Sequence, residues 1–234
     1  LELLIQQLQG CNNMKSIKFI LLLLLSSHSF SNSILLKGGM VHSGTGEKAK
    51  LQDILIDGDV ITSIGNSLII DAKTKVIELN GSPVTPGLIS PMSNIGIVEI
   101  NALDITRDDE SEILKAGFSI YGAFNPHSTG IPWNRSNGVT GSITSPSASS
   151  FPLFGLASYF VLDGNLNIKG KKDIAMFGRI GSSSGSRAET LSILESLLEL
   201  GIQSTNMPLE EVLEMRMADQ LELQAQDIAA LARL

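Results

Sequence analysis

The chain has 234 residues, of which 43% are hydrophobic and 18% are charged, so its composition is that of a globular protein and excludes a disordered tail. Its 17 basic and 24 acidic residues give a net charge of −7, which argues against nucleic acid as a partner because phosphates attract basic surfaces. One cysteine, Cys11, excludes an intrachain disulfide, and three histidines, His28, His42 and His127, leave little material for a histidine-rich metal site.

An export signal is predicted for residues 14–33. Met14 is followed by Lys15 and Lys18, then by the short apolar run 19–25 and a stretch of small residues, an order typical of a secretory signal peptide. The alternative, a permanent anchor, is weaker because a membrane-spanning helix needs roughly 20 apolar residues. We therefore expect an exported protein, periplasmic or secreted, that has no stable membrane anchor and is cleaved near Ser31 or Ser33.

Residues 1–13 begin without a methionine and place an apolar run ahead of the positive region that should open a signal. We interpret them as an upstream translated segment outside the natural product. The run Leu8-Gln9-Gly10-Cys11 has a faint likeness to a lipoprotein cleavage box. It lies on the wrong side of the hydrophobic core of the signal, so lipidation is given little weight.

Residues 34–80 are predicted to form a small β module. The apolar segments 34–39, 53–65 and 75–79 are separated by turn residues. Within the second of them, Asp57-Gly58 stands between two apolar runs and predicts a β-hairpin, because glycine accepts the positive φ of a tight hairpin turn.

From Gly81 onward, strands and helices alternate, which predicts repeated βα units. The segments 139–144, 157–162 and 173–177 are typical of buried strands. Ser186 and Glu189 form a capping box that opens a helix through Leu200, with Gly201 as its stop. A second helix is predicted from about Pro208 to the chain end, with an apolar stripe that favours core packing.

The run 53–65, followed by 76–81 and by Val84-Thr85-Pro86-Gly87-Leu88-Ile89, resembles the opening of the metal-dependent amidohydrolase superfamily. A second block, which contains Asn125-Pro126 and Asn137-Gly138-Val139-Thr140, is similar to the branch related to imidazolonepropionase. The resemblance implies a β-sandwich portion packed on a (β/α)8 barrel. It also implies an active site at the carboxyl ends of the barrel strands.

The same resemblance implies a metal site that this sequence does not supply. Members of the family usually follow Pro-Gly-Leu-Ile with an aspartate and a His-x-His pair that holds a divalent, zinc-like metal. Here Ser90 stands in place of the acid, and Met92 and Asn94 occupy the histidine positions. A thioether and a neutral amide are poor ligands for such a metal. Residues 157–162 also lack the lysine that some members carboxylate, so no cofactor is evident.

Length indicates a further gap, since about 150 residues remain from Gly81 onward whereas a full barrel takes roughly 250. The predicted fold class is therefore α/β: a partial (β/α)8 TIM-like barrel in residues 81–234, preceded by the β-sandwich portion and without its C-terminal part. A truncated reading frame is the favoured explanation. The open sheet edges of such a barrel are expected to expose apolar surface.

Several other side chains are weak candidates. His127 is a possible general base beside Asn125, and Arg135 is a possible anion ligand or, as we favour, a loop anchor. Carboxylates could replace the lost metal ligands, and the loop 181–186 could hold an anion at a helix start, although ordinary solvated acids and an ordinary loop are the simpler interpretations. The carboxylates in question are Glu99, Asp104 and Asp108.

Two functions remain. The first is an exported amidohydrolase-type hydrolase that acts on non-peptide carbon–nitrogen bonds, with its usual N-terminal metal ligands replaced. The alternative is a catalytically inactive binding or scaffold module of the same fold in the periplasm. The expected partner in both is a small molecule, as substrate or ligand, and the oligomeric state is left open.

Overall fold

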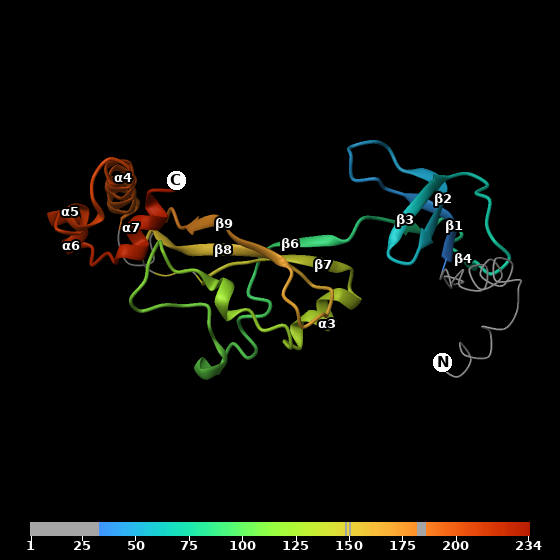
Figure 1. The fold of residues 1–234 in the computed structure, drawn as a ribbon, viewed down its shortest axis with the longest axis horizontal. Helices are drawn as coiled ribbons and strands as arrows, with labels where there is room; N and C mark the ends of the chain where they lie inside the picture. Colours follow the sequence, from blue (N-terminus) through green and yellow to red (C-terminus); the bar gives the residue numbers. More distant parts are fainter. Residues whose placement is uncertain (1–32, 148, 150, 182–185) are drawn as a thin grey trace, which may run out of the picture. The chain divides into compact units, whose positions relative to one another are not determined.

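The computed structural model describes residues 33–147, 149, 151–181 and 186–234, so the predicted upstream segment and nearly all of the predicted signal lie outside it. The described residues divide into two compact units, one up to residue 86 and the other from residue 87, and both are drawn in Figure 1. The sequence placed this boundary after residue 80. The structure places it later because β5 (Pro83–Val84) pairs with the first strand. None of the described helices combines the length and the apolar character needed to cross a bilayer.

The first unit is a five-stranded sheet in the order β3-β2-β1-β4, with β5 also beside β1. The predicted hairpin is confirmed, because β2 and β3 are antiparallel and Gly58 between them has φ +62°. The predicted sandwich is wrong for the described residues 33–86. The short strands are all used in ladders around β1 and β2, so none is left for a second layer. The strands are β1 (Ser33–Val41), β2 (Lys50–Asp57), β3 (Val60–Gly65) and β4 (Lys75–Glu78).

The second unit contains a four-stranded sheet in the order β6-β7-β8-β9. β6 and β7 are parallel, whereas the pairs β7–β8 and β8–β9 are antiparallel. The parallel pair is joined by the long connection 94–138, which holds two 3₁₀ turns and α3. The strands are β6 (Leu88–Ser93), β7 (Val139–Thr144), β8 (Leu153–Val161) and β9 (Gly170–Gly178), and the connection holds η2 (Asp104–Thr106), η3 (Ile120–Ala123) and α3 (Gly130–Ser136).

The three predicted strands of this unit are confirmed, but β9 is largely exposed and not buried as predicted. The repeated βα units predicted after β7 are wrong. The connections 145–152 and 162–169 have eight residues each, which is too short for a crossover between parallel strands. The chain therefore turns back as antiparallel hairpins. Within the described residues the sheet stays open, with β6 and β9 at its edges, and does not close into a barrel.

The predicted N-terminus of α4 (Arg187–Ser204) is confirmed, since the hydroxyl of Ser186 accepts the backbone N–H of Glu189 at 3.1 Å. The predicted stop at Gly201 is wrong, because the helix runs on to Ser204. Gly201 is buried, and a Cβ at this position would lie 2.7 Å from the carbonyl oxygen of Leu231. The glycine therefore allows a close approach between α4 and the last helix.

The predicted second helix is also wrong in its continuity, because three short helices take its place. Met215 has an extended backbone (φ −63°, ψ 134°), and Glu222 has a positive φ of 52°, so each interrupts the helical path. Most of the predicted apolar stripe still packs into the core, in three pieces, but Leu209 and Met217 are exposed. The helices are α5 (Leu209–Leu213), α6 (Arg216–Gln220) and α7 (Ala225–Leu231).

The second unit has two apolar clusters. One joins the C-terminal helices to β8 through Leu153, Leu197 and Ile228. The other lies between the sheet and the connection 94–138, where the fully buried ring of Phe160 stacks on Phe124 with centroids 3.8 Å apart. These clusters hold both the long connection and the helices against the sheet.

Gly201→Ala is expected to lower the free energy of unfolding by about 1–2 kcal/mol, because the new methyl group meets backbone atoms of α7 that cannot turn away. The better helix propensity of alanine offsets part of this cost. The matched control is Gly122→Ala, where the new methyl group meets no atom within 4 Å. Urea unfolding checks both, and equal stability of the two variants would contradict the close helix contact.

Candidate functional site

The carboxyl end of β6 is where the family resemblance places the first metal ligands. Met92 lies in β6 with 66% of its surface exposed, and Asn94 directly follows the strand and is also exposed. The side-chain amide of Asn94 donates to Oδ1 of Asn101 at 3.5 Å. Neither side chain is a strong ligand for a zinc-like ion, so the donors at this position do not fit the metal that the resemblance implies.

Buried hydroxyl groups join the ends of the parallel strands β6 and β7. The Oγ atoms of Ser93 and Ser142 lie 2.5 Å apart, and Oγ of Ser142 lies 3.0 Å from Oγ1 of Thr144. Thr144 in turn donates to the carbonyl oxygen of Ile95 at 3.0 Å. Ser142 and Thr144 are fully buried. These hydroxyls bond to one another and to the backbone, so they fix the strand ends.

Glu99, Asp104 and Asp108 are not brought together as substitute ligands. The described part of the chain contains no group of three or more histidine, cysteine, aspartate or glutamate side chains placed to hold a metal ion. Instead the Glu99 carboxylate accepts both the N–H and the hydroxyl of Thr129 at 3.3 Å, at the start of α3. Glu99 therefore stabilises the first turn of that helix.

Asn125 and His127 belong to the same turn. The side-chain amide of Asn125 donates to Glu99 at 3.3 Å, and its Oδ1 accepts the backbone N–H of His127 at 2.9 Å. The His127 residue itself is exposed. The turn therefore positions His127 through its backbone.

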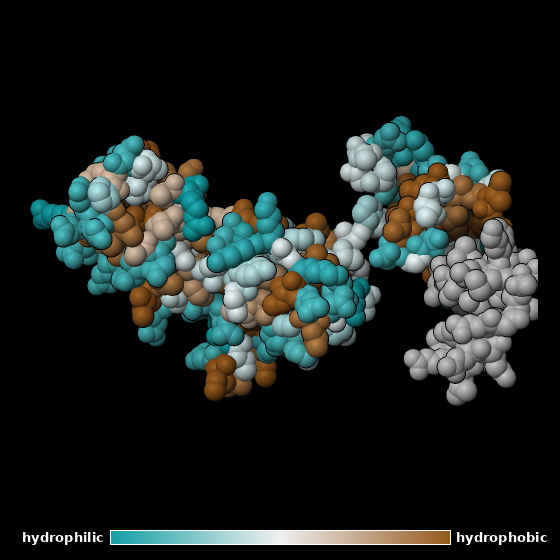
Figure 2. Space-filling model, viewed as in Figure 1, coloured by the Kyte–Doolittle hydropathy of each residue, from teal (hydrophilic) through white to brown (hydrophobic). Residues whose placement is uncertain are grey.

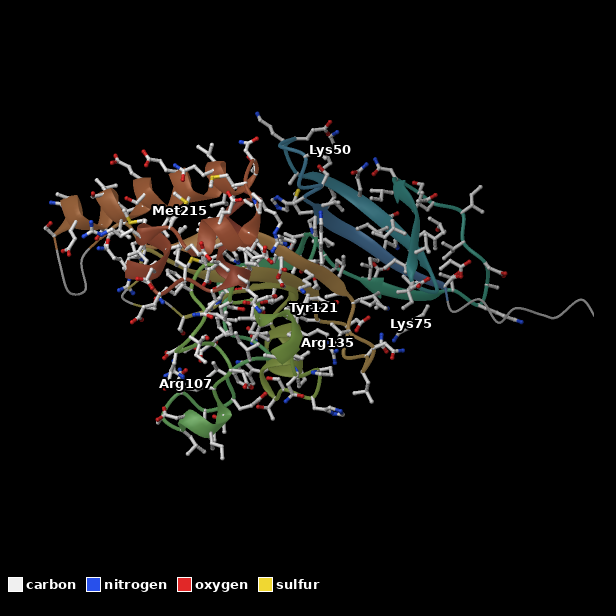
Figure 3. All side chains as sticks on the ribbon, turned by 60° about the vertical axis from the view of Figure 1, so that its left-hand side comes forward. Lys50, Lys75, Arg107, Tyr121, Arg135 and Met215 are labelled. Carbon is white, nitrogen blue, oxygen red and sulfur yellow. The ribbon has the colours of Figure 1, made fainter. Side chains whose placement is uncertain are left out.

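Arg135 lies in α3 and is labelled in Figure 3. Its Nη1 donates to the carbonyl oxygen of Leu162 at 3.5 Å. Its guanidinium also lies against Gly164, where a Cβ would come within 2.2 Å of Nη1. This position agrees with the interpretation of Arg135 as a loop anchor, here for the β8–β9 connection.

In that connection, the hydrogen bond from Lys169 and those from Asn165 hold the pKa of Asp163 well below its usual range.

The glycine- and serine-rich loop before α4 lies mostly outside the described residues, which omit 182–185. Ser186 at its end uses its hydroxyl to cap the helix. The interpretation as an ordinary loop that enters a capped helix accounts for the described part.

Two buried carboxylates escaped the sequence prediction. Asp109 is 1% exposed and accepts from Nε and Nη2 of Arg107, both at 3.2 Å, and from the hydroxyl of Ser147. The hydrogen bond to Asp109 raises the pKa of Arg107 above its usual value. Arg107 also donates to Glu110 at 2.6 Å, and Figure 3 shows it on the long connection after β6.

Asp227 is the second of these carboxylates and is fully buried. Its Oδ1 accepts the N–H groups of Lys115 and Gly117, each at 2.8 Å, and its Oδ2 accepts the N–H of Gln224 at 2.9 Å. The side chain of Gln224 completes a capping box at the start of α7. The spacing from Gln224 to Asp227 was the available sequence signal, although glutamine is an uncommon N-cap.

Comparison with known proteins gives a likeness of fold. No protein-family model and no curated protein sequence matches the chain. Among solved structures, the chain is similar to an amidohydrolase from Thermotoga maritima MSB8, with a TM-score of 0.59 and 17% sequence identity over 85% of this chain and 54% of that one. The described structure is thus a mixed α/β fold that resembles part of an amidohydrolase. The chain spans about half the length of that enzyme.

Two further structures have lower scores. A prolidase complexed with N-methylphosphonate-L-proline matches with a TM-score of 0.34 and 21% identity, over 48% of this chain and 25% of that one. A second amidohydrolase matches with a TM-score of 0.30 and 19% identity, over 50% and 32% of the two chains. At these scores the two structures add nothing to the likeness of fold.

Proposed function

We propose that this protein is an exported hydrolase of the amidohydrolase type that acts on a non-peptide carbon–nitrogen bond of a small molecule. The fold likeness to the Thermotoga amidohydrolase over most of the chain is the observation that supports it. The proposal includes the loss of the pair of histidine metal ligands that the family carries after its first barrel strand. The residues that the resemblance places there, Met92 and Asn94, are a thioether and an amide, so hydrolysis depends on other groups.

A second candidate function is a catalytically inactive module that binds a small molecule. It is favoured by the hydroxyl bonds among Ser93, Ser142 and Thr144, which occupy the strand ends with neutral groups that already bond to one another. A neutral, internally bonded strand end is suited to structural support, whereas hydrolysis of an amide needs an activated water.

The test uses the full chain, supplied with zinc or manganese, against a panel of linear amides, cyclic amides and cyclic imides. Released amine or carboxylate is measured by chromatography. We expect hydrolysis above the uncatalysed rate and, for Met92→Ala/Asn94→Ala, a rate within twofold of the unmodified chain. This double variant removes only side chains that the proposal assigns no catalytic role, and both are exposed.

Two results would count against the hydrolase. Absence of turnover on the whole panel, together with saturable binding of one of its members, would establish the inactive binding module instead. A loss of more than tenfold in Met92→Ala/Asn94→Ala would show that these two side chains take part in the reaction and that their assignment as replaced ligands is wrong.

A further inference from the structure

An exposed apolar loop projects from the second unit after β6. We call residues 100–105 the apolar tip, because Ile100 is 53% exposed, Leu103 46% and Ile105 89%. The η2 turn overlaps the end of this segment and is the green turn at the lower edge of that unit in Figure 1. Figure 2 shows hydrophobic atoms at the same place. Clustered exposed apolar side chains of this kind mark interaction sites more often than isolated ones do.

The apolar tip is held in one shape by its own hydrogen bonds. The hydroxyl of Thr106 lies 2.8 Å from the carbonyl oxygen of Leu103 and 3.0 Å from that of Ile100, and it accepts the N–H of Ile100 at 3.1 Å. The N–H of Glu99 donates to the carbonyl oxygen of Thr106 at 3.2 Å, which closes the base of the loop. A loop already ordered in this way loses little conformational entropy when a partner binds.

Acidic groups surround the apolar tip. A cavity of about 270 Å³ lies beside it and is lined by Asp104, Arg107, Glu110, Ser111 and Glu112. The one cation in this lining, Arg107, already bonds to Asp109 and Glu110. Asp108 is a further exposed carboxylate of the segment. The surface therefore combines apolar side chains with an excess of negative charge.

We propose that the apolar tip and the adjoining acidic cavity bind a protein segment that presents arginine or lysine beside apolar side chains. The apolar tip packs against the apolar residues of this segment, and its basic group enters the cavity among Asp104, Glu110 and Glu112. Charge complementarity selects this occupant, because a second copy of the chain carries a net charge of −7 and an anionic membrane surface is repelled.

The test measures binding of three fluorescent capped peptides to the full chain by anisotropy. The first has the sequence Leu-Arg-Arg-Leu, and its two controls are Leu-Glu-Glu-Leu and Ala-Arg-Arg-Ala. We expect the first peptide to bind at least tenfold more tightly than either control. This preference must weaken when the salt concentration is raised, because surface charges are screened.

The location is tested with variants. Ile105→Asn and Asp104→Asn/Glu112→Gln are each expected to weaken binding of the first peptide about tenfold. The matched controls change residues of the same kind elsewhere: Ile69→Asn, where the isoleucine is 96% exposed, and Asp59→Asn/Glu211→Gln. These controls should bind as the unmodified chain does, and circular dichroism should be the same for all variants.

Four outcomes would overturn the proposal. Equal affinity for the three peptides, or an equal loss of affinity in the control variants, would show that the proposed site does not bind the peptide. Self-association that Ile105→Asn abolishes would make the occupant a second copy of the chain. Binding to phosphatidylcholine vesicles that depends on Ile105 would make it a lipid surface.

Discussion

Asp227→Ala is expected to lower the free energy of unfolding by about 4 kcal/mol, the largest loss predicted for a single substitution in this chain. The carboxylate is fully buried and accepts N–H groups from Lys115, Gly117 and Gln224. Without it, three donors in a confined space lose their acceptor, and each unsatisfied buried donor costs about 1–3 kcal/mol. Chemical denaturation monitored by circular dichroism measures the change.

Two further variants make this prediction specific. Asp219→Ala removes an exposed carboxylate in the first turn of α6 and should change stability by less than about 0.5 kcal/mol. Asp227→Asn keeps one acceptor oxygen, so its stability should fall between those of the alanine variant and the unmodified chain. A loss in Asp219→Ala as large as that in Asp227→Ala would contradict a special role for the buried group.

Met92→His/Asn94→His is expected to create zinc binding at the end of β6, with affinity raised roughly a hundredfold over the unmodified chain, because two imidazoles replace a thioether and a neutral amide. Met92 lies in β6, Asn94 directly follows the strand, and both residues are exposed, so the two imidazoles are available to an ion from solvent. Isothermal titration with zinc chloride measures affinity and stoichiometry, and one ion per chain is expected.

The matched control for this gain is Lys75→His/Ile77→His, which places the same pair on the exposed strand β4 of the other unit. If the control gains zinc affinity to the same extent, the end of β6 offers nothing beyond an exposed pair of imidazoles. If neither double variant binds zinc, the expected gain of zinc affinity at the end of β6 is wrong.

Local signals in the sequence were sufficient to predict the positions of several helices and strands. The β2–β3 hairpin follows from Asp57-Gly58, and the start of α4 follows from Ser186 and Glu189, because turns and caps depend on a few neighbouring residues. Strand β7 occupies the predicted residues 139–144. Strand periodicity does not determine which strand pairs with which, so the antiparallel pairing of β8 and β9 was missed even though an eight-residue connection favours it.

The residues of the candidate site also differ in whether the local sequence could predict them. Met92 and Asn94 could be selected from their distance to Pro86-Gly87, which is a property of the local sequence. The role of Asp227 could not be, because its acceptor oxygens serve Lys115 and Gly117, the former 112 residues earlier in the chain. Contacts at such separation depend on the packing of α7 against the long connection after β6, and no local pattern specifies that packing.

The edges of the two sheets have different consequences for aggregation. β6 contains Pro91 and a register shift beside it, and β9 carries Lys171 and Lys172, and all of these features hinder strand addition from another molecule. The outer strand β3 has neither charge nor proline, and Ile61 and Ile64 on it are exposed. Intermolecular pairing of this chain is therefore favoured at the first sheet, whereas both edges of the second sheet are already protected.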